Sequence, residues 1–291
     1  MGGPDPSAHM VTGALEQVTD ALCYHGEGPV WSPTWGGLRW VDMLAGDVLT
    51  LREDGSVDRM HVGEVAAFVR PRTDGGWVVA TERGLARADE PHGIPTPWFD
   101  LWDDPSVRMN EGGVDSLGRL WAGTMGYDRV PGTARLFRVD PAGCVTVVLP
   151  DVTISNGIDL SPDRRRAYYD DTPTGRTDVF DVVDGELVNR RPFVTHDAGH
   201  PDGLTVDSAG NVWVALNGAG RVRCFSPAGA VLAEVELPVR LTTACTFGGA
   251  DLSDLYVTTS RENLDDPEPQ AGALFTVRVS VPGQPVRAFA G

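Results

Sequence analysis

The sequence predicts an all-β fold, a six-bladed β-propeller with four-stranded blades, from three observations. The 291 residues include 35 Gly and 22 Pro, and no long stretch repeats apolar residues at helical spacing, so many short strands joined by turns are expected. A turn followed by a strand with one large aromatic residue recurs six times. Subtracting the positions of these aromatics gives intervals of 37, 44, 47, 45 and 43 residues, close to the length of a propeller blade.

Each repeat is expected to place its aromatic residue at the equivalent point of one blade. The six residues are Trp40, Trp77, Trp121, Tyr168, Trp213 and Tyr256. An open two-sheet sandwich is the alternative all-β arrangement, but it does not account for six copies at this period.

Outer hairpins and a ring closure follow from the same pattern. Alternating runs flank a Pro-Ala-Gly turn at 134–149 and again at 220–237, the signal of a hairpin with a short loop. The segment 14–18 needs a partner strand, and a last strand pair at 273–279 and 285–289 is expected to supply it. Closing the ring in this way leaves few exposed strand edges.

Residues 1–10 resemble a vector-derived leader, with Met10 a plausible native start, so 11–291 is expected to form a single propeller domain. No signal peptide and no apolar run of about 20 residues is visible, and the cytoplasm is the expected compartment. The four cysteines form no Cys-x-x-Cys pair, and they are expected to be buried free thiols.

The charge restricts the partners. With 24 basic and 41 acidic residues, the chain carries a formal charge of −17. Nucleic acid and anionic membranes would be repelled by that field, whereas cations would be attracted.

Four polar residues precede the aromatic residue of their repeat by similar distances. Subtraction gives 13 for Glu27, 11 for Asn110, 12 for Asn156 and 11 for Asp202. In a propeller, near-equal offsets place these side chains at the same depth around the central channel. Taken singly, Asn-Gly and Pro-Asp-Gly are more often turns than ligands, so the prediction depends on the shared offset.

Carboxylate and amide oxygens suit Ca²⁺, Mg²⁺ or Mn²⁺. Zinc is not excluded, although no His or Cys occupies the matching offset. His25 and His200 each lie two residues before a proposed ligand, and we expect them to support the ligands rather than to bind the metal.

Five motifs resemble the senescence marker protein/regucalcin–gluconolactonase family, over about residues 22–275. They are Glu27-Gly-Pro-Val-Trp31, Arg108-Met-Asn110, Gly118-Arg-Leu-Trp-Ala-Gly-Thr-Met125, Asn156-Gly-Ile-Asp-Leu-Ser-Pro-Asp163 and Pro201-Asp-Gly-Leu204, and the stretch 245–259 is similar to the family's last blade. The resemblance implies a six-bladed propeller with one divalent cation in its channel, Ca²⁺ before Mg²⁺, Mn²⁺, Zn²⁺ or Fe²⁺.

The resemblance also implies residue roles. Glu27, Asn156 and Asp202 match the metal ligands, with Asp202 also the general base, and Arg108 and Asn110 match the pair that holds substrate oxygens. Asp128 matches a further substrate-binding acid, which is Glu in the animal members of the family. Glu111 replaces the usual Asp beside Asn110.

The expected reaction is hydrolysis of a small-molecule sugar-acid lactone by a monomer or weak homodimer. The metal would polarise the carbonyl, and either Asp202 or metal-bound hydroxide would act as the base. Two rivals remain: hydrolysis of another ester, such as an organophosphate or a specialised lactone, and a calcium-binding propeller without turnover. No Gly-x-Ser-x-Gly motif supports a serine hydrolase.

Overall fold

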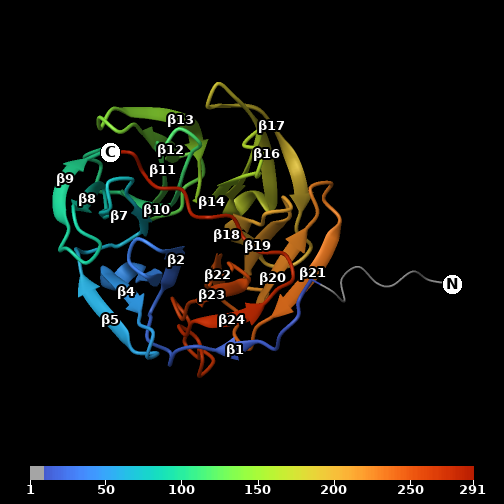
Figure 1. The fold of residues 1–291 in the computed structure, drawn as a ribbon. Coiled ribbons are helices and arrows are strands. Elements are labelled where there is room, and N and C mark those ends of the chain that lie inside the picture. Colours follow the sequence, from blue (N-terminus) through green and yellow to red (C-terminus); the bar gives the residue numbers. More distant parts are fainter. Residues whose placement is uncertain (1–9) are drawn as a thin grey trace.

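The computed structural model describes residues 10–291, which form six four-stranded antiparallel sheets around a central channel (Figure 1). The predicted six-bladed propeller is therefore confirmed. Two short 3₁₀ turns, η2 (Met43–Ala45) and η3 (Thr172–Thr174), are present among the described residues. No helix among them is long and apolar enough to cross a membrane.

The first three blades follow one another along the chain, each from its inner to its outer strand. Blade one is β2 (Gly26–Ser32), β3 (Gly37–Asp42), β4 (Asp47–Leu51) and β5 (Val57–His61). Blade two is β6 (Phe68–Pro71), β7 (Trp77–Ala80), β8 (Gly84–Ala88) and β9 (Thr96–Asp100). Blade three is β10 (Val107–Val114), β11 (Leu120–Gly126), β12 (Ala134–Val139) and β13 (Val145–Val152).

The other three blades complete the ring. Blade four is β14 (Ser155–Leu160), β15 (Arg166–Asp171), β16 (Arg176–Val183) and β17 (Glu186–Thr195). Blade five is β18 (His200–Val206), β19 (Val212–Asn217), β20 (Arg221–Phe225) and β21 (Val231–Glu236). Blade six is β22 (Thr242–Gly248), β23 (Asp254–Thr259), β24 (Phe275–Arg278) and, as its outer strand, β1 (Glu16–Gln17).

The N-terminal strand closes the ring as predicted, because β1 pairs antiparallel with β24. The expected second strand at 285–289 is wrong. Residues 280–291, called here the C-terminal strap, cross one end of the channel and reach blade two, where Phe289 forms a single parallel bridge with Arg72 (Figure 1). Both edges of β24 are already paired, by β23 and by β1, so residues 285–289 find no free edge beside β24.

The recurring aromatic residues lie on the second strand of each blade, between neighbouring sheets. Five of them are at most 2% exposed and so form the packing between the blades: Trp40, Trp77, Trp121, Tyr168 and Trp213. Tyr256 is only partly buried and stacks on Trp31 with a centroid distance of 6.1 Å.

The expected leader lies largely outside the described residues. Met10 is 9% exposed and packs with blades five and six, while the domain limits themselves stay a prediction. All four cysteines are free, but only three are buried, since Cys144 is exposed.

Candidate active site

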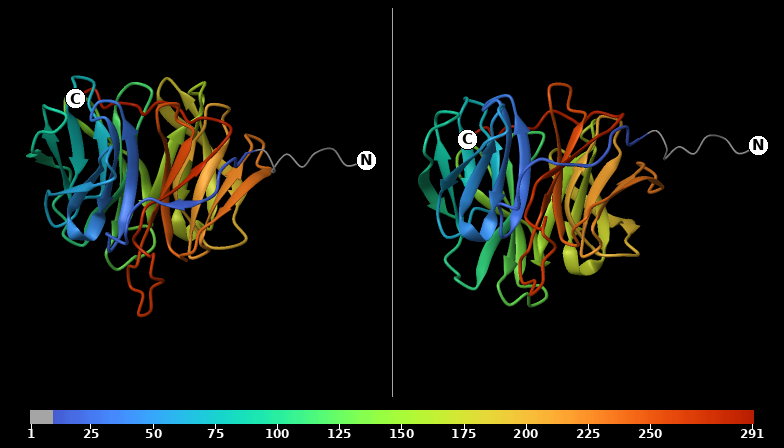
Figure 2. Two further views of the ribbon diagram at one scale, coloured as in Figure 1. Left: turned by 60° about the horizontal axis from the view of Figure 1, so that its bottom comes forward. Right: turned by 90° about the horizontal axis from the view of Figure 1, so that it is seen from below.

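A cavity of about 260 Å³ lies at the end of the channel where the inner strands begin. This end is called the mouth here. The C-terminal strap crosses the opposite end, and the long connection between β23 and β24 projects on the mouth side (Figure 2). Five of the six predicted site residues line the cavity: Glu27, Arg108, Asn110, Asn156 and Asp202.

β-bulges near the start of the inner strands position these side chains. In blades three, four and five, two residues of the inner strand lie unpaired between two register positions, and the first of them is Asn110, Asn156 or Asp202. In blade one, Glu27 is the last paired residue before the bulge. A bulge bends its strand and redirects a side chain, so equivalent bulges bring side chains from different blades into one cavity.

The glycines after Asn156 and Asp202 belong to strands, not to turns. A Cβ on Gly157 would clash with the backbone of Leu204, and a Cβ on Gly203 would clash with Ala244. Glycine is therefore needed because the inner strands of neighbouring blades approach closely here. The turn interpretation therefore does not apply to Asn156-Gly157 or to Asp202-Gly203.

Two buried carboxylates give the cavity its electrostatic character. Glu27 and Asp202 are 3% and 6% exposed. Burial raises the pKa of Glu27, and the charges of Asp202 and Glu111 raise it further. Burial likewise raises the pKa of Asp202, to which Glu111 and Glu262 add, while a hydrogen bond from Asn217 opposes the shift. Both groups would ionise more easily beside a positive charge.

The donor set fits a hard divalent cation. Asp202 Oδ2 accepts a hydrogen bond from Asn217 Nδ2 at 2.9 Å, and no partner of Oδ1 is found within residues 10–291. No group of three or more His, Cys, Asp and Glu residues in this range is arranged to hold a metal ion. An ion here would therefore need the amide oxygen of Asn156 beside the two carboxylates, which is oxygen chemistry suited to Ca²⁺ or Mg²⁺.

Arg108, Asn110 and Asn156 form a connected wall beside the carboxylates. Arg108 Nη1 donates to Asn110 Oδ1 at 2.9 Å, and Asn110 Nδ2 donates to Asn156 Oδ1 at 3.2 Å. Asn156 Nδ2 in turn donates to Thr172 Oγ1 at 2.7 Å, which fixes the amide orientation. Nε and Nη2 of Arg108 have no hydrogen-bond partner among the described residues. They are therefore free to bind a ligand oxygen.

The two histidines differ in environment, and their expected supporting roles stay predictions. His25 is buried, with Nδ1 2.8 Å from Ser260 Oγ and Nε2 3.9 Å from Glu27 Oε1. Burial, and then the charges of Arg108 and Arg129, lower its pKa to about 3, so the imidazole is neutral at physiological pH. His200 is exposed on the cavity rim.

Asp128 is the one predicted site residue that does not line the cavity. Its side chain is exposed, and Oδ1 accepts a hydrogen bond from the Val130 amide at 3.3 Å. Its neighbour Arg129 lines the cavity instead. The substrate-binding role of Asp128 stays a prediction.

Sequence reasoning missed Asn217 and Glu262. Asn217 lies at the end of β19, directly opposite His200 in the register, and this pairing is the signal that could have found it. Glu262 lies in the connection between β23 and β24, and no motif marks it.

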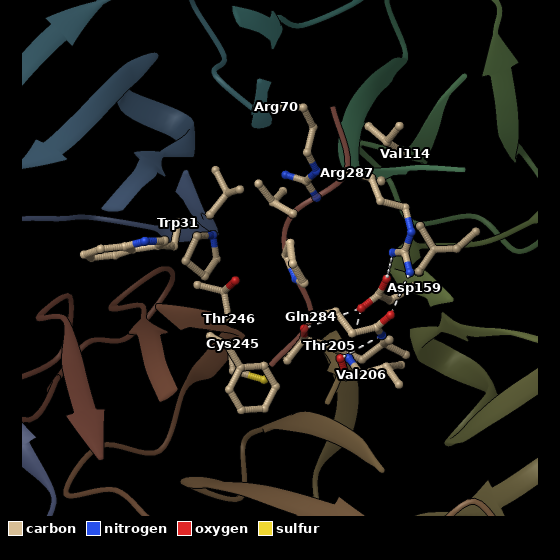
Figure 3. Close-up of a pocket in the computed structure, with 18 residues that line it drawn as sticks. Trp31, Arg70, Val114, Asp159, Thr205, Val206, Cys245, Thr246, Gln284 and Arg287 are labelled. Carbon is tan, nitrogen blue, oxygen red and sulfur yellow. Dashed lines mark hydrogen bonds and ion pairs between the residues drawn. The ribbon is translucent and has the colours of Figure 1, made fainter. Parts of the chain in front are cut away.

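A second, smaller cavity of about 90 Å³ lies under the C-terminal strap at the far end of the channel (Figure 3). Arg287 Nη1 donates to Asp159 Oδ1 at 2.7 Å. Gln284 Nε2 donates to the carbonyls of Leu160 and Val206 at 2.9 and 3.0 Å. Arg287 and Gln284 therefore hold the strap against blades four and five.

Comparison with known proteins shows which chains this one is similar to. The chain is 40% identical over 279 residues to 6-deoxy-6-sulfogluconolactonase of Pseudomonas putida, covering 91% of this chain and 95% of that protein. It is 35% identical over 285 residues to a pentonolactonase of Haloferax volcanii, covering 93% and 96%. It superposes on the calcium-binding protein regucalcin of Agrobacterium tumefaciens with a TM-score of 0.89 at 29% identity, covering 97% and 99%.

The family described as the SMP-30/Gluconolactonase/LRE-like region matches residues 25–261, which include every residue proposed above as a ligand or substrate contact. The chain belongs to this family.

Proposed function

We propose that this chain is a divalent-metal-dependent lactonase that opens a sugar-acid lactone in the mouth cavity. The observation that carries the proposal is the convergence of Glu27, Asn156 and Asp202 with Arg108 and Asn110 on one cavity. The lactonases among its relatives support the reaction class. Ca²⁺ is the proposed cation, with Mg²⁺, Mn²⁺, Zn²⁺ and Fe²⁺ as alternatives.

Glu27, Asn156 and Asp202 would hold the cation, which when bound supplies Lewis-acid polarisation of the lactone carbonyl. The reaction adds one water across the ring ester: a C–O bond forms at the carbonyl carbon, the ring C–O bond breaks, and the ring oxygen leaves as a hydroxyl. Asp202, a buried carboxylate of the cavity, would take the proton of the attacking water or orient the hydroxide that acts as the base in its place. Arg108 and Asn110 bind and orient oxygens of the substrate.

Single substitutions test the proposed roles of Asp202 and Asn156. Asp202→Asn and Asn156→Ala are expected to lower kcat/KM for gluconolactone by about 100-fold or more, because they remove the proton acceptor and a cation ligand. The measurement is initial rates of acid release on purified protein. Asp197→Asn, an exposed carboxylate outside the cavity that pairs with Arg223, is the matched control.

Metal dependence is tested separately. Removal of bound metal with a chelator is expected to abolish hydrolysis and lower the Tm, and adding back Ca²⁺, Mg²⁺, Mn²⁺, Zn²⁺ or Fe²⁺ singly should identify the metal that restores both. A metal that raises the Tm without any hydrolysis of gluconolactone, pentonolactones or an organophosphate would favour the alternative, a calcium-binding propeller without turnover.

A further inference from the structure

Two arginine side chains line the mouth cavity at different depths. Arg108 is 4% exposed and donates a hydrogen bond to Asn110, whereas the side chain of Arg129 is 56% exposed at the rim. One guanidinium is therefore deep in the cavity and the other lies at its rim.

Arg129 projects from the connection between β11 and β12 of blade three. Its nearest charged partner is Glu262 of blade six, whose Oε1 lies 3.9 Å from Arg129 Nη2. Blades three and six are opposite members of a ring of six, so the pair meets over the channel. At 3.9 Å this contact is too long for a hydrogen bond, and within residues 10–291 the Arg129 guanidinium makes none.

A structural ion pair explains this arrangement poorly. An exposed pair at such a distance contributes little to stability. Arg129 also has a φ of 55°, in the left-handed region that disfavours residues with a Cβ. The backbone is held there by a turn in which the Arg129 amide donates to Gly126 O at 3.0 Å.

We propose that Arg129 is a specificity-determining residue that binds an anionic substituent of the lactone. The inference rests on the proposed lactonase function and deepens it, because it names the substrate class as sugar-acid lactones with a second acidic group, such as a carboxylate, phosphate or sulfonate. The guanidinium fork matches the oxygens of these groups. In a molecule with a net charge of −17, a local cation at the rim offsets the repulsion of such a substrate.

The Glu262 carboxylate is the anion that would compete with an anionic substituent for Arg129. This carboxylate also lies 3.7 Å from His25 Nδ1, so it lies between two nitrogen groups without a hydrogen bond to either. An anionic substituent would take its place on Arg129, and removing the charge of Glu262 should therefore favour anionic lactones.

The test compares two γ-lactones with the same ring. Glucaro-γ-lactone carries a carboxylate where glucono-γ-lactone carries a hydroxymethyl group. The quantity measured is the ratio of kcat/KM for the anionic lactone to kcat/KM for the neutral one. Arg129→Met is expected to lower this ratio about tenfold, the usual value of a hydrogen bond to a charged group. Arg129→Lys should lower it less, and Glu262→Gln should raise it.

Arg164→Met is the matched control, since Arg164 is also an exposed arginine with positive φ, 59°, but lies outside the mouth cavity. The inference is overturned if Arg129→Met leaves the ratio unchanged while both lactones are hydrolysed. A wild-type protein that hydrolyses neither lactone, nor the phosphorylated and sulfonated gluconolactones, would overturn the proposed function and the inference with it. If the wild-type protein hydrolyses only the neutral lactone, the inference is overturned and the proposed function stands.

Discussion

Asp170 on β15 is a fully enclosed carboxyl group outside the proposed catalytic set. It is 0% exposed, and neither of its oxygens has a hydrogen-bond partner among the described residues. Burial raises its pKa well above the ordinary value, and the charges of Asp202 and Asp178 add to the effect. The folded protein therefore binds a proton at Asp170 more tightly than the unfolded chain does.

A prediction about the pH dependence of stability follows at this residue. Because the folded-state pKa is raised, the wild-type protein loses stability as the pH rises from the unfolded pKa towards the folded one. Asp170→Asn removes this loss, so its free energy of unfolding should match wild type near pH 4 and exceed it by about 1 kcal/mol or more near pH 8. Urea unfolding at several pH values measures the difference.

Asp181→Asn is the control for this experiment. Hydrogen bonds from Arg191 and Asn189 lower the pKa of Asp181. The Asp181→Asn variant should therefore be less stable than wild type above about pH 4, the opposite of the effect expected for Asp170→Asn. An Asp170→Asn variant whose stability difference from wild type does not depend on pH would contradict the prediction.

At the scale of elements, the C-terminal strap connects parts of the ring that are distant in sequence. Phe289 is fully buried in the core cluster of blades one to three, its amide donates to Pro71 O at 2.8 Å, and Arg72 Nε donates to Gly291 O at 2.6 Å. The strap is therefore part of the core although it contains no named strand.

Phe289→Ala is expected to lower the free energy of unfolding by about 3 kcal/mol or more, the cost of a large cavity in a core. Guanidinium unfolding measures it, with Ile94→Ala as the control, because Ile94 is 78% exposed. A loss below about 1 kcal/mol would mean that the strap is not an integral part of the core.

The strap also explains why the strand expected at 285–289 could not be excluded from the sequence. The alternation of residues 285–289 resembles a strand, but a strand needs a free edge, and whether an edge is free depends on pairings between distant segments. The same limit applies to the bulges beside Asn110, Asn156 and Asp202. A shared offset from an aromatic residue predicted that these side chains lie together, but not that a register shift directs them.

At the scale of the whole molecule, the repeat alone predicted six blades and the closure by β1, since periodicity and edge pairing are encoded locally. The shared offset also predicted that Glu27, Asn110, Asn156 and Asp202 lie together, whereas Arg108, the fifth predicted residue in the cavity, came from the family resemblance. Asn217, Arg129 and Glu262 were missed because they come from strand ends and loops, whose positions depend on the whole ring.

The net charge gives a prediction for the whole protein. A charge of −17 should accelerate encounter with a divalent cation, and salt screens such attraction. We expect the association rate constant of the metal, measured by stopped-flow mixing with metal-stripped protein, to fall several-fold as NaCl rises from about 0.05 to 0.5 M. A rate constant independent of salt would contradict this expectation.

The position of the strap affects how a substrate would enter the cavity and how its product would leave. Because residues 280–291 cross the far end of the channel, the proposed lactone and its product would both pass through the mouth. The hydroxy acid would have to leave before the next lactone enters, and it would carry one negative charge more than the lactone. The acidic chain would then repel the product more strongly than the substrate, so ring opening itself would promote clearance of the cavity.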